Sequence, residues 1–296
     1  PGYVVELSGG RRRQQVLFDF FNYAGLHRSV RLCTTPLTHL DDLTVTTGLD
    51  GTTGTVAYEA VLGGSGHGEI AVDVTLTDAD GHEVARATGA SGELRVDDVH
   101  PWRPGEGYLY ELTVRLLDAA GDVVDEYPLP VGVRTVRVDG TRFLVNEEPF
   151  YFRGFGKHED AAVRGKAHDD VLMVHDFALM EWIGANSLRT SHYPYAEDVL
   201  EYADRRGILV IDETAAVGIN TGLAAGVFGA EPHVTFSEET VNDRTRDAHA
   251  RAIRELVERD KNHPCVVMWS IANEPESVTP EARAAAQRTR RPASRI

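Results

Sequence analysis

Residues Val266–Pro275 read Val-Val-Met-Trp-Ser-Ile-Ala-Asn-Glu-Pro, an apolar run that ends in an amide, a carboxylate and a proline. The apolar run predicts a strand buried on both faces, as in a parallel sheet. Pro275 has no backbone donor and should end the strand, so Glu274 is expected at the carboxyl end, where α/β barrels carry catalytic groups. A carboxylate in that place can also cap a following helix, and spacing alone leaves both roles open.

The segments before Val266 repeat the order strand, then helix. Strands are predicted at Phe150–Gly156, Asn186–Arg189 and Ile208–Glu213, and helical spacing at Met173–Met180, Ala196–Arg206 and Ser237–Asp260, the last with Ser237 as its N-cap. Four strand–helix units in succession predict a parallel sheet. Because a closed barrel needs eight units, the sequence predicts the first half of a (β/α)₈ barrel.

Polar side chains follow each of the four predicted strands. The groups are Lys157–Asp160, Thr190–Tyr195, Asp212–Glu213 and Asn273–Glu274. Helix capping or a satisfied core histidine would explain any one of them. Four such groups at the same edge of a parallel sheet instead predict the cleft of an enzyme.

The residues before about 135 follow a different pattern. From 37 to 134, apolar residues alternate with polar ones in short segments separated by glycine- and aspartate-rich turns, which predicts an immunoglobulin-like β-sandwich. This block gathers no titratable cluster and is interpreted as scaffold, with Trp102 expected to pack against it. Residues 1–36 include the aromatic strand-like run Gln15–Tyr23, interrupted by Asp19, and are interpreted as the end of a larger domain.

Composition narrows the class of partner. The chain has 296 residues and a formal net charge of −16, which argues against nucleic acid and against an anionic membrane surface. It does not exclude an anionic substrate in a locally basic cleft. The two cysteines, Cys33 and Cys265, are expected to be reduced thiols, and no run approaches the roughly 18 apolar residues of a membrane span. The chain starts at Pro1 without methionine or signal segment, so we expect its natural N-terminus to lie further upstream.

Several motifs together resemble bacterial β-glucuronidases of glycoside hydrolase family 2. They are Asp19–Arg28, Phe155–Asp160, Val174–Asp176, Trp182–Asn186, Arg189–Tyr195, Ile211–Thr214 and Ser270–Pro275. The resemblance extends to roughly residue 285. It implies a multidomain β plus α/β fold: the remnant of a jelly-roll sugar-binding domain (1–36), an immunoglobulin-like sandwich (37–134) and the first half of a (β/α)₈ TIM barrel (135–296).

The resemblance also implies roles for single residues. Glu274 matches the acid/base, which protonates the glycosidic oxygen and later deprotonates water, and Asn273 matches the residue that hydrogen-bonds the sugar 2-hydroxyl. Asp19 and His192 match residues that line the sugar pocket. Residues 221–236 match a loop over the entrance. Neither a metal nor an organic cofactor is implied.

The chain also departs from the family. Retaining hydrolysis needs a second carboxylate about 5 Å from the first. In the family it lies in a Thr-Glu-Tyr-Gly type motif, which this sequence lacks, as it lacks the residues that bind the sugar carboxylate. Asp212 and Glu213 match the family too and are interpreted as structural support.

The resulting expectation is a retaining hydrolase of β-D-glucuronides whose nucleophile lies outside this chain, so that the chain alone is inactive. Two alternatives stay open: another family 2 glycosidase of β-galactosidase or β-mannosidase type, and a non-catalytic carbohydrate-binding fragment. For the intact enzyme the resemblance implies a homo-oligomer, a tetramer in the family, and a bacterial cytoplasmic location.

Overall fold

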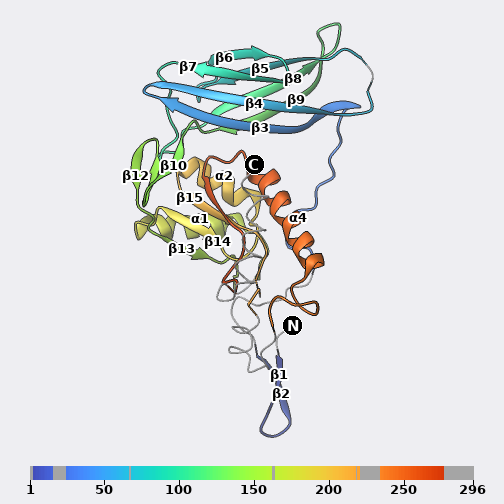
Figure 1. The fold of residues 1–296 in the computed structure, drawn as a ribbon, viewed down its shortest axis with the longest axis vertical. Helices are drawn as coiled ribbons and strands as arrows, with labels where there is room; N and C mark the ends of the chain where they lie inside the picture. The colour runs from blue at the N-terminus through green and yellow to red at the C-terminus, as the bar shows by residue number, and fades with distance from the viewer. Residues whose placement is uncertain are drawn as a thin grey trace.

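The computed structural model describes residues 3–15, 25–66, 68–161, 164–217, 219–220 and 234–276. A β-sandwich and a parallel sheet with its helices are stacked along the long axis of the molecule, and an N-terminal hairpin projects from the opposite end (Figure 1). The hairpin pairs β1 (Tyr3–Leu7) with β2 (Arg11–Gln15). The predicted strand Gln15–Tyr23, with Asp19, falls almost wholly outside the described residues, as does most of the loop 221–236.

The sandwich consists of two antiparallel sheets, which confirms the predicted immunoglobulin-like part. One sheet has the order β3-β4-β7 and the other β6-β5-β8-β9. The strands are β3 (Thr38–Asp50), β4 (Thr53–Gly64), β5 (Ala71–Thr77), β6 (Glu83–Thr88), β7 (Ser91–Val96), β8 (Tyr110–Leu117) and β9 (Val123–Val131). Alternate residues such as Val56, Val74 and Leu112 are fully buried between the sheets, as the period-two pattern requires.

The second part is a four-stranded parallel sheet in the order β13-β14-β15-β16, which confirms the predicted half barrel. Its strands are β13 (Gly154–Lys157), β14 (Ser187–Thr190), β15 (Leu209–Glu213) and β16 (Val266–Ser270), and its helices are α1 (Asp170–Trp182), α2 (Glu197–Arg206) and α4 (Asp243–Asp260). Gly207 ends α2 in the left-handed conformation, with φ of 65°, as its position in the sequence predicted.

The predicted continuous strand Phe150–Gly156 is wrong. Phe150 ends a small antiparallel sheet of β10 (Val136–Asp139), β11 (Arg142–Val145) and β12 (Glu148–Phe150), and β13 begins only at Gly154. Phe152, in the link between the two, packs edge-on against Phe143 and Phe150, with ring centroids 5.0 Å and 4.9 Å away. The aromatic run therefore folds back on its own hairpin, which an apolar pattern cannot distinguish from one longer strand.

Helix α4 begins later than predicted. Its N-cap is Asn242, not Ser237, because the Asn242 side chain accepts from the backbone of Thr245 while the Thr245 hydroxyl accepts from the backbone of Asn242. This reciprocal pair satisfies two donors at the helix start. The Ser237 hydroxyl instead lies 2.9 Å from that of Thr240, in a turn before the helix.

Strand β16 also differs from its prediction. It ends at Ser270, well before Pro275, so the proline is not what ends it. Val266 is buried, but the residues from Val267 to Ser270 are only half-buried rather than enclosed on both faces. The reason is that β16 is an edge of the sheet within the described residues, with β15 on one side only. Asn273 and Glu274 consequently lie on a loop beyond the strand.

Trp102 joins the two parts, where the sequence predicted packing against the sandwich. Its indole is fully buried in the core of the parallel-sheet part, and Nε1 donates to the carbonyl of Asp204 at 2.7 Å. Arg134, on the segment that leaves the sandwich, donates to the carbonyls of Pro264 and Val266 at 2.7 and 2.8 Å. The segment between β7 and β8 thus inserts the Trp102 side chain into the core of the parallel-sheet part.

A second contact joins strand β3 to the loop between α4 and β16. Asn262 accepts from the backbone of Val45 at 2.9 Å and donates to the carbonyl of Leu43 at 2.7 Å, while Lys261 pairs with Asp42 at 2.6 Å. The sandwich therefore supports the helix and strand that lead to Glu274.

Candidate active site

The carboxyl ends of β13 to β16 gather polar side chains at one edge of the sheet, as the sequence predicted. Because parallel strands all point the same way, the residues that end β14 and β15 lie beside those that follow β16. The pairing of Glu213 with Ser270 sets this register, since the two residues are partners across β15 and β16. The structure thereby brings the segments with His192, Asn273 and Glu274 to a common edge.

Glu213 lies at the centre of this edge and is fully buried. Its Oε1 accepts from Nδ1 of His192 at 2.7 Å, and its Oε2 accepts from the Ser270 hydroxyl at 2.6 Å and lies 3.1 Å from Nε of Arg189. A buried carboxylate without partners would be costly. His192 and Ser270 donate hydrogen bonds to it, and the Arg189 guanidinium, whose Nε donates to the Ser191 hydroxyl, balances its charge. Its three partners come from β14, from the turn after it and from β16.

The loop after β16 carries Asn273, which was predicted to bind the substrate, and Glu274, the predicted acid/base. Asn273 donates its backbone N–H to the carbonyl of Ala216 at 3.1 Å, and its Oδ1 accepts from Nη2 of Arg189 at 3.4 Å. His249 of α4 lies 2.6 Å from the carbonyl of Ile271 and holds the start of the loop. The loop is therefore fixed from three directions.

Glu274 itself has a left-handed backbone, with φ of 45°, and an exposed side chain. For a residue other than glycine this conformation costs on the order of 1–3 kcal/mol and persists only where its surroundings enforce it. Within the described part of the chain, its carboxylate makes no hydrogen bond or ion pair. The side chain is thus presented at the edge without being used in the fold.

The turns after β13 and β14 are joined to each other. The rings of His158 and His192 meet edge to face with centroids 5.2 Å apart. The Tyr195 hydroxyl donates to the carbonyls of Lys157 and Ser191, and Lys157 pairs with Asp176 of α1 at 2.8 Å. His192 is therefore held by contacts on two sides, at a position fixed relative to Glu213.

Asp212, the neighbour of Glu213 in β15, faces the opposite side of the sheet. Its Oδ1 accepts from the Thr190 hydroxyl at 2.9 Å, whereas Oδ2 meets no N–H or hydroxyl donor in the described residues. Beside it is the Asp260 carboxyl, which Arg259 holds through two contacts of 2.7 and 2.6 Å. The pKa of Asp212 is raised to about 8, mainly by burial and to a smaller extent by the hydrogen bond to Asp260. The two carboxyls thus share a proton behind the sheet, in a structural role.

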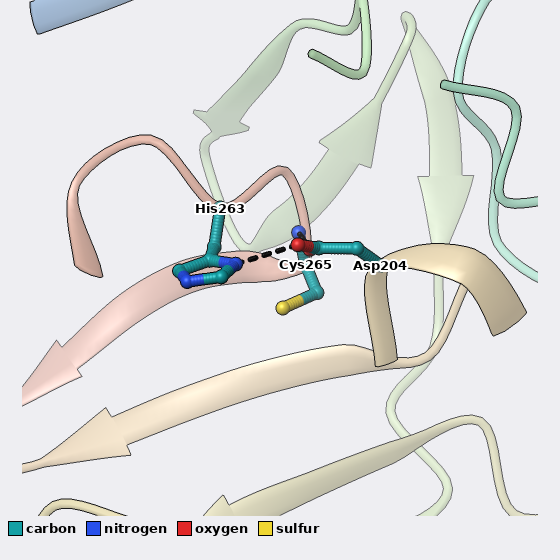
Figure 2. A group of neighbouring side chains, drawn as sticks. All are labelled: Asp204, His263 and Cys265. Atoms are coloured by element: carbon teal, nitrogen blue, oxygen red, sulfur yellow. Dashed lines mark hydrogen bonds and ion pairs between the residues drawn. The ribbon is translucent and has the colours of Figure 1, made fainter. Parts of the chain in front are cut away.

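Three groups of potential metal ligands occur in the described residues, and the most buried is Asp204, His263 and Cys265 (Figure 2). Asp204 already accepts from Nδ1 of His263 at 2.6 Å and from the backbone of Cys265 at 2.9 Å. The Cys265 thiol donates to the carbonyl of Leu200 at 3.6 Å, and burial raises its pKa well above the usual value. Because metal binding needs a thiolate and free acceptors, this cluster does not fit a metal and is a structural clamp.

The other two ligand groups are partly exposed. In the first, Asp78 accepts from the backbones of Asp80 and His82 at 3.0 and 2.8 Å, which is turn geometry. In the second, His168 pairs with Asp170 at 2.9 Å. A hollow of 350 Å³ lies at the junction of the two parts, and its walls include the already paired Arg134 and Asn262. None of these features adds a catalytic or ligand-binding group to the carboxyl ends of the strands.

Of the predicted site residues, the structure brings His192, Asn273 and Glu274 to one edge, and Asp19 lies outside the described residues. Sequence reasoning did not single out Arg189 and His158, and it assigned Glu213 only a supporting role. Arg189 stood within a motif that carried the resemblance, which was the available signal. The convergence of Arg189, His192 and Ser270 on Glu213 is a three-dimensional property that no spacing in the sequence indicates.

Comparison with known proteins places this geometry in context. The profile described as "Glycosyl hydrolases family 2, TIM barrel domain" matches residues 136–292, and "Glycosyl hydrolases family 2" matches residues 38–134. The β-glucuronidase of Paenibacillus borealis is 49% identical over 273 residues, which are 92% of this chain and 44% of the relative. That of Canis lupus familiaris is 50% identical over 271 residues, which are 89% of this chain and 39% of the relative.

Solved structures of β-glucuronidases are also similar in fold to this chain. The β-D-glucuronidase of Dictyoglomus thermophilum has a TM-score of 0.85 at 42% identity, covering 100% of this chain and 50% of that one. The β-glucuronidase of Ruminococcus gnavus in complex with D-glucuronic acid has a TM-score of 0.80 at 36% identity, covering 99% of this chain and 47% of that one. The chain thus spans half or less of each of these relatives. Among the described helices, none is long and apolar enough to cross a membrane.

Proposed function

The chain belongs to the glycosyl hydrolases of family 2, and from this premise we propose that its intact form is a retaining β-glucuronidase of which this chain carries the acid/base side. The observation that carries the proposal is the position of Asn273 and Glu274. They follow β16 at the edge where His192 and Arg189 meet Glu213. The β-glucuronidase relatives at 49% and 50% identity support glucuronides as the substrate class.

In the proposed reaction Glu274 protonates the glycosidic oxygen and later takes a proton from water. Its exposed carboxylate is not bound within the described fold and is available for this exchange. Arg189 holds Oδ1 of Asn273, which leaves the Nδ2 amide free to donate to the sugar 2-hydroxyl. His192 lines the sugar pocket, and Asp19 is proposed to do so from the N-terminal part. The nucleophile, about 5 Å from Glu274, comes from outside this chain.

The proposal extends to organisation. We place the domain limits at 1–36, 37–134 and 135–296, supported by the profile limits of 38–134 and 136–292. For the intact enzyme we propose a homo-oligomer in the bacterial cytoplasm that needs no cofactor. Light scattering on the intact enzyme tests the oligomer, because a mass of one subunit would contradict it.

The test of the acid/base role replaces Glu274 in the intact enzyme. Glu274→Gln should slow hydrolysis of alkyl glucuronides roughly 10²- to 10⁴-fold, because their leaving groups need proton donation. Aryl glucuronides with acidic leaving groups should lose less. Glu276→Gln, two positions along the same loop, is the matched control and should leave both rates near wild type. Equal losses on both substrates for Glu274→Gln would overturn the assignment.

A further inference from the structure

Glu213 accepts two hydrogen bonds and forms one ion pair through its two oxygen atoms, and this arrangement goes beyond structural support. Oε1 accepts from His192, while Oε2 accepts from Ser270 and faces Arg189. The carboxylate is fully buried, so none of these contacts is weakened by exchange with bulk water. The backbone N–H of Glu213 is also fixed, donating to the Thr190 hydroxyl at 2.7 Å. Both the backbone and the carboxylate of Glu213 are consequently held in place.

The contact with His192 determines which ring nitrogen carries the proton. Because Glu213 is a pure acceptor when ionised, Nδ1 of His192 must be the donor in this 2.7 Å contact. The nitrogen left to meet a ligand is then Nε2. The direction of a hydrogen bond from His192 to a sugar hydroxyl is therefore decided by a residue that need not touch the sugar.

The contact with Arg189 has a similar effect on Asn273. Glu213 forms an ion pair with Nε of Arg189, whose N–H donates to the Ser191 hydroxyl, and the other end of the guanidinium, Nη2, donates to Oδ1 of Asn273. The planar guanidinium transmits orientation along its length. Asn273 is thereby turned so that its amide donor is the group left for substrate.

We propose that Glu213 is a positioning residue that sets the hydrogen-bonding polarity of two sugar-facing groups, His192 directly and Asn273 through Arg189. Its consequence for catalysis rests on the proposed function, but the placement of the proton on His192 does not. A carboxylate is required because a glutamine offers only one acceptor atom. With glutamine, either His192 or the Arg189–Ser270 side would face an amide N–H in place of an oxygen.

Asp212 supplies a matched control. It neighbours Glu213 on the same strand and is equally buried, but its carboxyl meets Thr190 and Asp260 on the opposite side of the sheet. Asp212→Asn therefore changes a buried acid to its amide without altering any contact of His192. A general disturbance of the sheet would affect both variants alike, whereas a specific role belongs to Glu213 alone.

The first test needs no activity. Long-range ¹H–¹⁵N correlation spectra of the 296-residue chain report whether each histidine nitrogen is protonated, and the signals that vanish in His192→Gln identify His192. We expect a protonated Nδ1 in the wild type and in Asp212→Asn. In Glu213→Ala, where the acceptor is gone, the proton should move to Nε2. An unprotonated Nδ1 in the wild type overturns the proposal, even if the variants fail to fold.

The second test uses the intact form of this enzyme and compares Glu213→Gln with Asp212→Asn. Misplacement of binding groups costs roughly 10²-fold, so kcat/KM should fall by about that factor in Glu213→Gln, while Asp212→Asn stays within a few-fold of wild type. Equal losses in the two variants would overturn the proposal. A correct proton position on His192 combined with an unaffected kcat/KM would overturn its link to catalysis and leave the acid/base proposal standing.

Discussion

The sandwich and the parallel-sheet part each enclose an apolar core, but they differ in how they treat polar side chains. In the described sandwich strands the buried polar residues are Thr75 and Thr113, which carry no charge. The parallel-sheet part buries four carboxyl groups, Asp204, Asp212, Glu213 and Asp260. Each has dedicated partners, because a buried carboxylate without them would be severely destabilising. The second part thus holds charged groups in place inside its core at a cost in desolvation, whereas the described core of the sandwich is apolar apart from these two threonines.

The largest expected effect concerns activity. This chain alone should show no glucuronidase turnover, a loss of at least ~10⁶-fold against an intact relative, because without the nucleophile no glycosyl-enzyme intermediate forms. The assay compares the purified chain with the intact enzyme on an aryl glucuronide. Turnover above the uncatalysed rate that disappears in Glu274→Gln would mean that a partner chain or another carboxylate completes the site.

The next effect is on the pH dependence of stability. The pKa of Asp212 is raised to about 8 from 3.8, so the protonated carboxyl favours the folded state below pH 4, and this stabilisation is lost as the pH rises through 8. At about 1.4 kcal/mol per tenfold change in proton affinity, the loss is about 6 kcal/mol at most. Urea unfolding at pH 5 and pH 9 measures the part of it that falls between these two pH values, about 4 kcal/mol.

Asp212→Asn should remove most of this pH dependence. Some should remain from His263: burial lowers its pKa, but the hydrogen bond and charge of Asp204 raise it overall, so its stabilisation is also lost at high pH. In the sandwich, burial raises the pKa of Tyr58 and Tyr110 from a value of 10.0, outside this window. An unchanged pH profile in Asp212→Asn would contradict the shared proton.

A substitution in the core of the sandwich should make the two parts unfold separately. Leu112 is fully buried in the middle of the sandwich, and Leu112→Ala should destabilise it by roughly 2–5 kcal/mol. The three tryptophans, Trp102, Trp182 and Trp269, lie in or on the parallel-sheet part. Far-UV circular dichroism should therefore show the loss, while tryptophan fluorescence shifts less. Leu200→Ala, in the other core, is the reciprocal control.

The smallest effect is expected at the junction. Asn262→Ala removes two hydrogen bonds to β3, which contribute about 1–2 kcal/mol together. The midpoints of urea unfolding measured by fluorescence and by circular dichroism should move apart, because the sandwich and the parallel-sheet part are then less strongly coupled. Arg142→Ala, which removes an exposed ion pair with Asp139, should leave both midpoints in place. Coincident midpoints in Asn262→Ala would show that Trp102 and Arg134 suffice for coupling.

The sequence predicted the elements well where periodicity carries the information. The alternation in β4, β5 and β8 and the helical spacing of α1 and α2 both appear as expected, since each reflects a single buried face. It failed where two local signals compete. Ser237 and Asn242 are both good N-caps, and only the reciprocal contact with Thr245 decides between them.

For the site, the sequence predicted which strand ends carry polar groups but not which of those groups meet. The strand-end position of Glu213 was visible, whereas its three partners come from separate elements whose register depends on the whole sheet. Trp102 is a similar case. Its indole has no sequence-local partner, and only the packing of the two parts shows that it belongs to the second.

The position of Trp102 has a consequence for the order of events during synthesis. Its hydrogen-bond partner, Asp204, lies 102 residues later in the chain. At translation rates of roughly 5–20 residues per second, the indole is synthesised about 5–20 s before that carbonyl. The strands of the sandwich, from β3 to β9, are complete by Val131, within that interval. Until helix α2 has been made, the nascent sandwich therefore lacks the partner whose carbonyl receives the indole N–H.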